Sequence, residues 1–211
     1  MSITKIIAKY ERWKIAWQGT DLLGNLWLRI ARRFRSPLPQ IPFIYPYSPD
    51  KLAQREQIWK NLERGLLLED KGYYLTWDTP FSLMDRYCET LSSRNDRTEW
   101  FMGKQPVLGG FCCNTEVMKW WYQSWDEPIG GVSCILGYGE SGLLQMRAAG
   151  IHLLDTLGPP DVMKKESSEL ETGTVSWRKG SVEVSLVGFM HYGTMYRLNI
   201  GLLKHSEQKR L

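Results

Sequence analysis

The chain has 211 residues, enough for one sizeable hydrophobic core or two small ones. Its hydrophobic fraction of 43% and charged fraction of 24% are ordinary for a globular protein. The net charge of +4 is unevenly distributed: residues 1–65 carry 12 basic and 5 acidic side chains (+7), residues 66–140 carry 6 and 11 (−5), and the remainder carries 9 and 7 (+2). Such a charge dipole argues against a uniform nucleic-acid-binding surface and favours oriented contacts with another macromolecule.

The cysteine pattern and the hydropathy predict a reduced, soluble, cytoplasmic protein. The four cysteines show no C-x-x-C spacing, and the adjacent pair Cys112–Cys113 is poorly placed for a disulfide bond. Charged residues recur from Lys5 onward, which argues against a signal peptide. The sequence has no apolar run close to the roughly 18 residues that a transmembrane helix needs.

Residues 1–36 have the pattern of a basic amphipathic helical arm. Apolar residues recur at helical spacing, with basic residues off their stripe: Ile6, Tyr10, Trp13, Trp17, Leu23, Trp27, Ile30 and Phe34. The pattern favours an arm packed on the body of the protein. Two alternatives remain open: a basic face that lies on an anionic membrane, and a site for a partner protein.

A proline-rich segment separates this arm from the rest of the chain. Residues 36–50 hold five of the ten prolines, so we expect an extended, semi-rigid tether over 37–50. A helix then runs from Asp50 to Arg64 and is ended by Gly65. Its apolar side consists of Leu52, Ile58, Trp59 and Leu62.

The middle of the chain alternates strand and helix signals. We expect one or two strands over 66–77 around a turn at 70–72, then a helix over 80–91 that is capped by Asp78 or Thr79. Strand patterns follow at 99–102 and 106–108 and again at 129–138. The apolar and aromatic stretch 117–125 fits a strand or a helix equally well.

The C-terminal third predicts a helix followed by an antiparallel meander. The helix covers 141–157 and is stopped by Gly158, Pro159 and Pro160. Three strands with alternating apolar and polar residues follow, at 175–177, 182–186 and 196–200, with a turn at 178–181. The helix is expected to cover the apolar face of these strands through Leu143, Leu144, Ala148, Ile151, Leu154 and Leu157.

These patterns predict an α+β fold, with antiparallel sheet or sheets and covering helices. The globular body spans 51–211. Strand, helix and further strands occur twice in the same order, which indicates two tandem sub-modules, 66–128 and 129–203.

No catalytic or metal-binding signature emerges from the histidines and cysteines. The three histidines, His152, His191 and His205, have no metal-ligand spacing, and His152 is expected to be a partly exposed helix residue. Cys112 or Cys113 with His191 is the one available nucleophile–base pair, next to a 109–111 loop that could offer backbone N–H groups to an oxyanion. A buried cysteine that acts as a small hydrophobe is the favoured interpretation.

The segment 137–142 has the form G-x-G-x-x-G between a strand and a helix, as a dinucleotide site does. A repeated β-α-β pattern is missing, and Glu140 would place a carboxylate near a pyrophosphate. Glycines needed for a tight turn explain the motif better, so we expect no cofactor.

The most suggestive binding surface lies at 120–127, where aromatic residues adjoin two acids. Its members are Trp120, Trp121, Tyr122, Trp125, Asp126 and Glu127. Exposed, they would anchor a basic protein partner. The alternative is that Trp121 and Trp125, four residues apart, form the buried face of a helix.

Several stretches resemble small bacterial immunity proteins, which neutralise polymorphic or secretion-system toxins. The resemblance spans 66–203 and is carried by YLTWDTP at 74–80, LLDTLGPPD at 153–161, VSWRKGSVEVSLVGF at 175–189 and MYRLNIGLL at 195–203. It implies a non-catalytic inhibitor that binds a cognate toxin domain and occludes its active site or substrate surface. No catalytic or binding residue follows from it. Two other classes stay open: a small enzyme that uses a cysteine nucleophile or binds a nucleotide at Gly137–Gly142, and a membrane or nucleic-acid adaptor acting through 1–35.

Overall fold

The computed structural model describes residues 41–93, 96–164, 171–190 and 194–203, so the predicted arm at 1–36 and the start of the predicted tether lie outside it. The described residues confirm the α+β class, with one eight-stranded antiparallel sheet, a two-stranded sheet and covering helices. The elements are α3 (Lys51–Leu62), β1 (Gly65–Leu68), the 3-10 helix η1 (Glu69–Lys71), β2 (Tyr73–Thr76), the 3-10 helix η2 (Phe81–Arg86), β3 (Thr90–Ser93), β4 (Arg97–Val107), β5 (Phe111–Trp120), β6 (Gly131–Tyr138), α4 (Gly139–Leu157), β7 (Val162–Lys164), β8 (Glu171–Lys179), β9 (Val182–Met190) and β10 (Thr194–Leu202).

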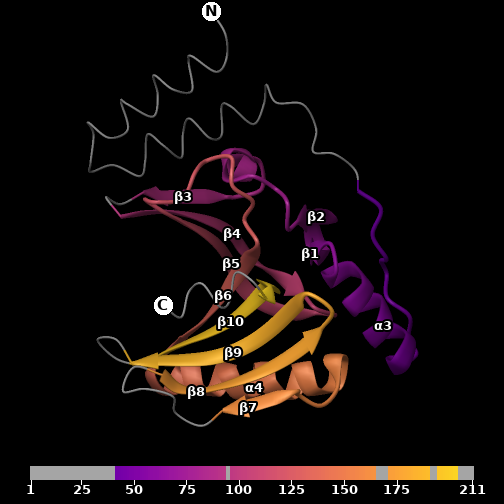
Figure 1. Cartoon of the computed structure of the whole chain (residues 1–211). Helices are drawn as coiled ribbons and strands as arrows, with labels where there is room; N and C mark the ends of the chain where they lie inside the picture. The colour runs from indigo at the N-terminus through magenta and orange to yellow at the C-terminus, as the bar shows by residue number, and fades with distance from the viewer. Residues whose placement is uncertain (1–40, 94–95, 165–170, 191–193, 204–211) are drawn as a thin grey trace, which may run out of the picture.

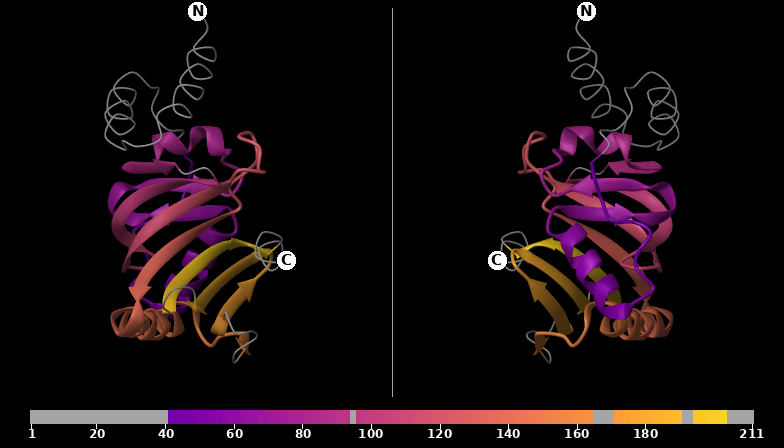
Figure 2. Two further views of the ribbon diagram at one scale, coloured as in Figure 1. Left: turned by 90° about the vertical axis from the view of Figure 1, so that its left-hand side faces the viewer. Right: turned by 90° about the vertical axis from the view of Figure 1, so that its right-hand side faces the viewer.

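The large sheet is strongly curved and has the order β3-β4-β5-β6-β10-β9-β8-β7 (Figure 1). Every neighbouring pair in this order is antiparallel. The chain leaves β6 through α4, crosses three strands and returns as β7 at the edge of the sheet. Figure 2 shows that α4 lies at one end of the molecule and that η2 and β3 lie at the opposite end.

A single hydrophobic core joins one face of the large sheet to the helices and to the β1–β2 hairpin. The core positions predicted for the C-terminal strands are confirmed, because Val182, Val184 and Leu186 of β9 are buried in this core, as are Leu198 and Ile200 of β10. The polar residues between them in β9, Glu183 and Ser185, are buried as well, so this strand is covered on both faces. The predicted turn between β8 and β9 is also present, with Gly180 at φ +59°.

Small residues allow α4 to approach the sheet closely. Its buried face consists of Gly142, Ala149, Leu153, Thr156 and Leu157. A Cβ atom at Gly142 would lie 2.5 Å from the carbonyl carbon of Gly137, so only glycine fits at this strand–helix junction. The helix ends at Leu157, where Gly158 and the two prolines were expected to stop it.

The predicted apolar stripe of α4 is wrong in most of its members. Leu144, Ile151 and Leu154 are 64%, 72% and 51% exposed, and Ala148 is exposed as well. Both sides of the helix carry aliphatic residues, and the side with Gly142 and Ala149 packs on the sheet because it permits the closer contact.

The segment 41–50 is extended, as expected for its prolines, and it is packed along α3. Asp50 caps this helix, since its carboxylate accepts a hydrogen bond of 2.8 Å from the Ala53 N–H. The Asn61 side chain accepts from the Ile44 N–H and donates to the Ile44 carbonyl, both at 3.0 Å. The Ser48 N–H donates to Gln57 Oε1 at 2.7 Å.

The expected helix over 80–91 is wrong beyond its first turns. The structure has the 3-10 helix η2, and Leu91 belongs to β3, where it pairs with Trp100 of β4. The local pattern of apolar residues fits a helix, but pairing with a strand that is remote in sequence determines the outcome.

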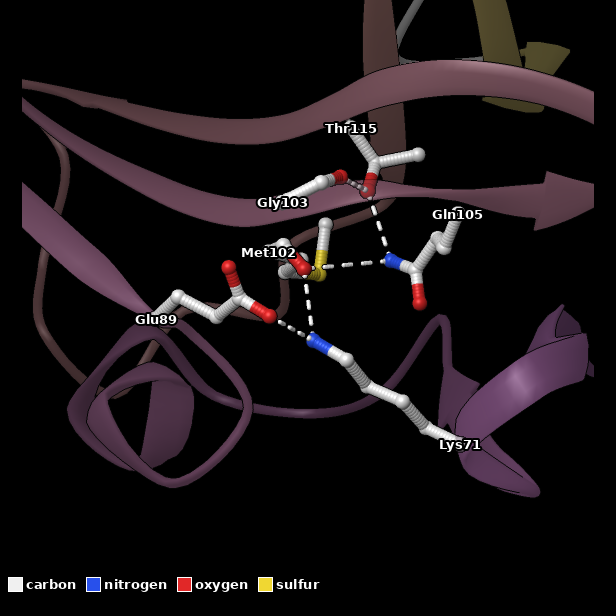
Figure 3. A network of polar contacts seen from close by, with 6 residues as sticks. All are labelled: Lys71, Glu89, Met102, Gly103, Gln105 and Thr115. Carbon is white, nitrogen blue, oxygen red and sulfur yellow. Dashed lines mark hydrogen bonds and ion pairs between the residues drawn. The ribbon is translucent and has the colours of Figure 1, made fainter.

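Lys71 of η1 donates a hydrogen bond to the backbone of β4 at a β-bulge (Figure 3). The register shifts between Phe101 and Gly103, and the Met102 carbonyl accepts a hydrogen bond of 2.7 Å from Lys71 Nζ. The same ammonium group lies 2.7 Å from Glu89 Oε1. The contact fixes the β1–β2 hairpin to the large sheet.

The eight strands form one sheet across the boundary proposed between sub-modules 66–128 and 129–203, because β5 pairs with β6. The first strand of the proposed N-terminal module, β2, belongs to the separate two-stranded sheet. The continuous sheet does not test the division of the body into two modules, which stays a prediction.

Candidate functional site

The β5–β6 connection, residues 121–130, carries the predicted aromatic and acidic surface. The alternative of a helix with Trp121 and Trp125 on its buried face is wrong: β5 ends at Trp120, and a turn follows. The Trp120 N–H donates to Gln123 Oε1 at 2.9 Å, and the Gln123 N–H donates to the Trp120 carbonyl at 3.1 Å. The Trp121 N–H donates to the Asp96 carbonyl at 2.9 Å, which attaches the start of the connection to the β3–β4 turn.

Two of the four predicted aromatic residues project into solvent. Trp121 is 73% exposed and Tyr122 is 66% exposed. Their rings meet edge to face with centroids 5.8 Å apart. A large exposed pair of this kind offers apolar area and polar hydrogen-bonding groups together, as protein–protein anchors do.

The other two tryptophans attach the connection to the body. Trp125 is half-buried, meets the fully buried Trp100 edge to face at 5.9 Å, and has the Lys119 ammonium group 4.7 Å from its ring centroid. Trp120 is half-buried beneath the Arg97 guanidinium, which lies 5.8 Å from its centroid. These contacts hold the exposed pair on a fixed support.

The end of the connection is held by η2 and by its own side chains. The N–H groups of Phe81 and Ser82 donate to the carbonyls of Glu127 and Trp125, at 3.1 and 2.9 Å. Glu127 Oε1 accepts from the Ser124 N–H at 2.9 Å. The acid at 127 therefore shapes the loop, and Asp126 is an exposed charge beside it.

The charges around the exposed pair are mixed. Asp126 is exposed, whereas Asp96 forms an ion pair with Arg97 at 3.4 Å and Lys119 lies against the ring of Trp125. The exposed carboxylate of Asp126 beside the aromatic anchor favours a basic group on a partner. This loop is the candidate functional site.

Of the two adjacent cysteines considered as nucleophiles, Cys112 is exposed and Cys113 is buried. His191 lies outside the described residues, so the proposed nucleophile–base pair stays untested. Cys113 adjoins the buried Cys134, and the hydrogen bond between these two thiols, with burial, holds the pKa of Cys134 well above its usual range. A thiol in that state is a poor nucleophile.

The backbone N–H groups of the loop at 109–111 already have a partner within the chain. The Gly109 N–H donates to Glu69 Oε1 at 2.7 Å, and Gly110 donates to the same carboxylate. Burial raises the pKa of Glu69, and these two hydrogen bonds oppose the rise. The carboxylate thus occupies the donors that an oxyanion would need.

His152 is half-buried on α4, as expected for a partly exposed helix residue. Its Nε2 atom lies 2.9 Å from the Leu108 carbonyl, and its ring packs 5.5 Å from that of Phe111. It supports the β4–β5 hairpin.

Gly137 and Gly142 are explained by their close packing at the junction of β6 and α4, and Gly139 by its backbone φ of +54°. Glu140 in the first turn of α4 is exposed. Across the described ranges, no cluster of three or more histidine, cysteine or acidic side chains is arranged to hold a metal ion.

Two buried ion pairs were not predicted from the sequence. They involve strand residues that alternate with the residues that face the hydrophobic core. Glu116, 2% exposed in its side chain, lies 3.2 Å from Arg197 Nη1, and the equally buried Glu183 accepts from Arg178 at 2.8 Å. Alternating charged residues within the strands were the available signal, but a buried pair across strands requires the register. Each of the two buried carboxylates therefore has a basic partner within the fold.

Comparisons with known proteins found no match among protein-family models, curated proteins or solved structures. Within the part of the chain that the structure describes, no helix has the length and apolar character needed to cross a membrane.

Proposed function

We propose that the chain is a non-catalytic binding protein, an inhibitor of the immunity type that neutralises a cognate bacterial toxin domain by covering its active site or substrate surface. One observation carries the proposal: Trp121 and Tyr122 are both more than half exposed on a loop that hydrogen bonds hold at each end. A soluble protein exposes such a pair at a cost in hydrophobic free energy, and binding a partner recovers that energy.

The support of the loop favours binding without rearrangement. The backbone at Trp121, Gln123 and Glu127 is hydrogen bonded, so little conformational entropy is lost when a partner covers the site. The exposed carboxylate of Asp126 beside the aromatic pair favours a partner with a basic surface. A toxin domain that acts on nucleic acid or on another anionic substrate has such a surface, and this protein would cover it.

The test is affinity capture of the tagged protein from its own host, with the eluted proteins identified by mass spectrometry. We expect one dominant partner in a 1:1 ratio, whose toxicity is suppressed when both proteins are expressed together. Binding should resist moderate salt, because the aromatic anchor contributes more than the surface charges. Recovery of membranes, of nucleic acid or of no partner would contradict the proposal.

A further inference from the structure

The outer face of α4 carries an apolar stripe that packs on nothing in the described part of the chain. Leu144, Ala148, Ile151 and Leu154 are all exposed, and they recur at i, i+4, i+7 and i+10. Residues at these spacings form one face of a helix, opposite to the face that packs on the sheet. Three large aliphatic side chains at 51–72% exposure on one face indicate a contact surface.

Two of the charged residues on this face, Arg147 and Asp155, have a symmetrical arrangement about Ile151. Arg147 precedes Ile151 by four residues, and Asp155 follows it by four. Ala148 and Leu154 are likewise three residues before and three residues after it. The central part of the stripe, residues 147–155, is therefore complementary to itself when two helices run in opposite directions.

We propose that α4 is the interface of a homodimer, in which two copies of the helix pack antiparallel about a two-fold axis at Ile151. Each Arg147 then faces Asp155 of the second copy, and each Ala148 faces Leu154 of the second copy. The large side chain at 154 fits above the small one at 148, as ridges fit into grooves between packed helices. A two-fold axis duplicates each contact, which doubles the effect of any one substitution.

Charge complementarity is what selects a second copy as the occupant. Asp155 is also paired with Lys51 of the same chain, so dimerisation would place this carboxylate between two cations. All three charged groups lie at the surface, and a pair at the rim of an interface loses little hydration. An apolar stripe alone would accept many partners. The opposite charges four residues before and four residues after Ile151 specify the antiparallel pairing.

The position of α4 leaves the candidate functional site free. The β5–β6 connection is bonded to η2, and α4 lies at the opposite end of the molecule (Figure 2). A dimer through α4 would therefore present two aromatic loops that point away from each other. With the axis at Ile151, the two copies of the helix overlap over residues 145–157, about 20 Å of length, which suits a small and weak interface.

The test is sedimentation equilibrium of the full chain over about 1–100 µM, with charge-reversal variants. We expect a monomer–dimer equilibrium for the unmodified protein. Arg147→Asp alone and Asp155→Arg alone should each weaken dimerisation by about tenfold or more, since like charges then face each other twice. The double variant Arg147→Asp/Asp155→Arg should recover it to within a few fold. Unchanged far-ultraviolet circular dichroism would show that the variants fold.

The remaining outcomes contradict the proposal. A monomer at all concentrations overturns it. Hydrogen exchange then identifies the true occupant: a protected α4 in that monomer would indicate that residues 1–40 cover the stripe, and an unprotected α4 would leave it for a different protein. A dimer that Ile151→Glu does not weaken would place the interface elsewhere.

Discussion

Asn61→Ala should detach the segment 41–50 from α3. The Asn61 side chain is buried, and it bonds both the N–H and the carbonyl of Ile44 at 3.0 Å. Removing it leaves two partly buried backbone groups without their partner. At about 1 kcal/mol for each hydrogen bond, with a further contribution from poorer packing of Tyr47 and Phe43, the free energy of unfolding should fall by about 2–3 kcal/mol.

The free energy is measured by urea denaturation, and the local effect by hydrogen exchange at residues 43–48. In a chain of this length, the melting temperature should fall by about 4–12 °C. Gln57→Ala is the matched control, because it removes a single hydrogen bond to the same segment, from the Ser48 N–H, and should lower stability by about 1 kcal/mol. If Asn61→Ala changed stability by less than the control and left exchange at 43–48 unaltered, the described packing of this segment would be refuted.

Two further predictions concern a buried carboxylate and a tight junction. Burial raises the pKa of Glu69 above its ordinary value near 4.5, so the folded state binds the proton more tightly than the unfolded chain does. The resulting stability is fully present below about pH 4.5 and is lost as the pH rises through the raised pKa. Urea denaturation at several pH values should therefore show Glu69→Gln gaining stability relative to the unmodified chain as the pH rises; a constant difference would contradict the burial effect. Gly142→Ala should lower the free energy of unfolding by more than about 2 kcal/mol, because its Cβ would lie 2.5 Å from the Gly137 backbone. Thermal denaturation checks this, with Gln145→Gly, at an exposed position of the same helix outside the apolar stripe, as a control that should cost about 0.5–1 kcal/mol.

Much of the fold follows from local patterns. Asp50 before an amphipathic run predicted the start of α3, and the two prolines after Leu157 predicted the end of α4. Alternation within β9 and β10 predicted which of their residues enter the core. These features depend on backbone geometry and on the period of a single element, so one sequence is sufficient to find them.

The errors occur where distant segments determine the result. The sequence offers two aliphatic faces on α4, and the sheet selects the one with Gly142 and Ala149 because small residues allow close packing. Leu91 fits a helix by spacing, yet it becomes a strand residue through its pairing with Trp100. Neither outcome has a local signal.

The candidate site was predictable in composition and not in geometry. The cluster of aromatic residues near Asp126 could be seen in the sequence, but a strand and a helix fitted it equally well. The turn at Trp120 decides which rings are exposed: it directs Trp121 and Tyr122 into solvent, and Trp125 packs against Trp100.

The most direct test of the central claim compares three forms of the tagged protein in parallel capture from the host. They are the unmodified chain, the double variant Trp121→Ala/Tyr122→Ala, and Tyr138→Ala, which removes a tyrosine of similar exposure, 62%, from the junction of β6 and α4. If the β5–β6 connection binds the partner, the double variant should bind it about 100-fold or more weakly, with unchanged stability, and Tyr138→Ala should bind it as the unmodified chain does. Equal recovery of the same partner by all three forms would show that the exposed pair at 121 and 122 is not the binding site.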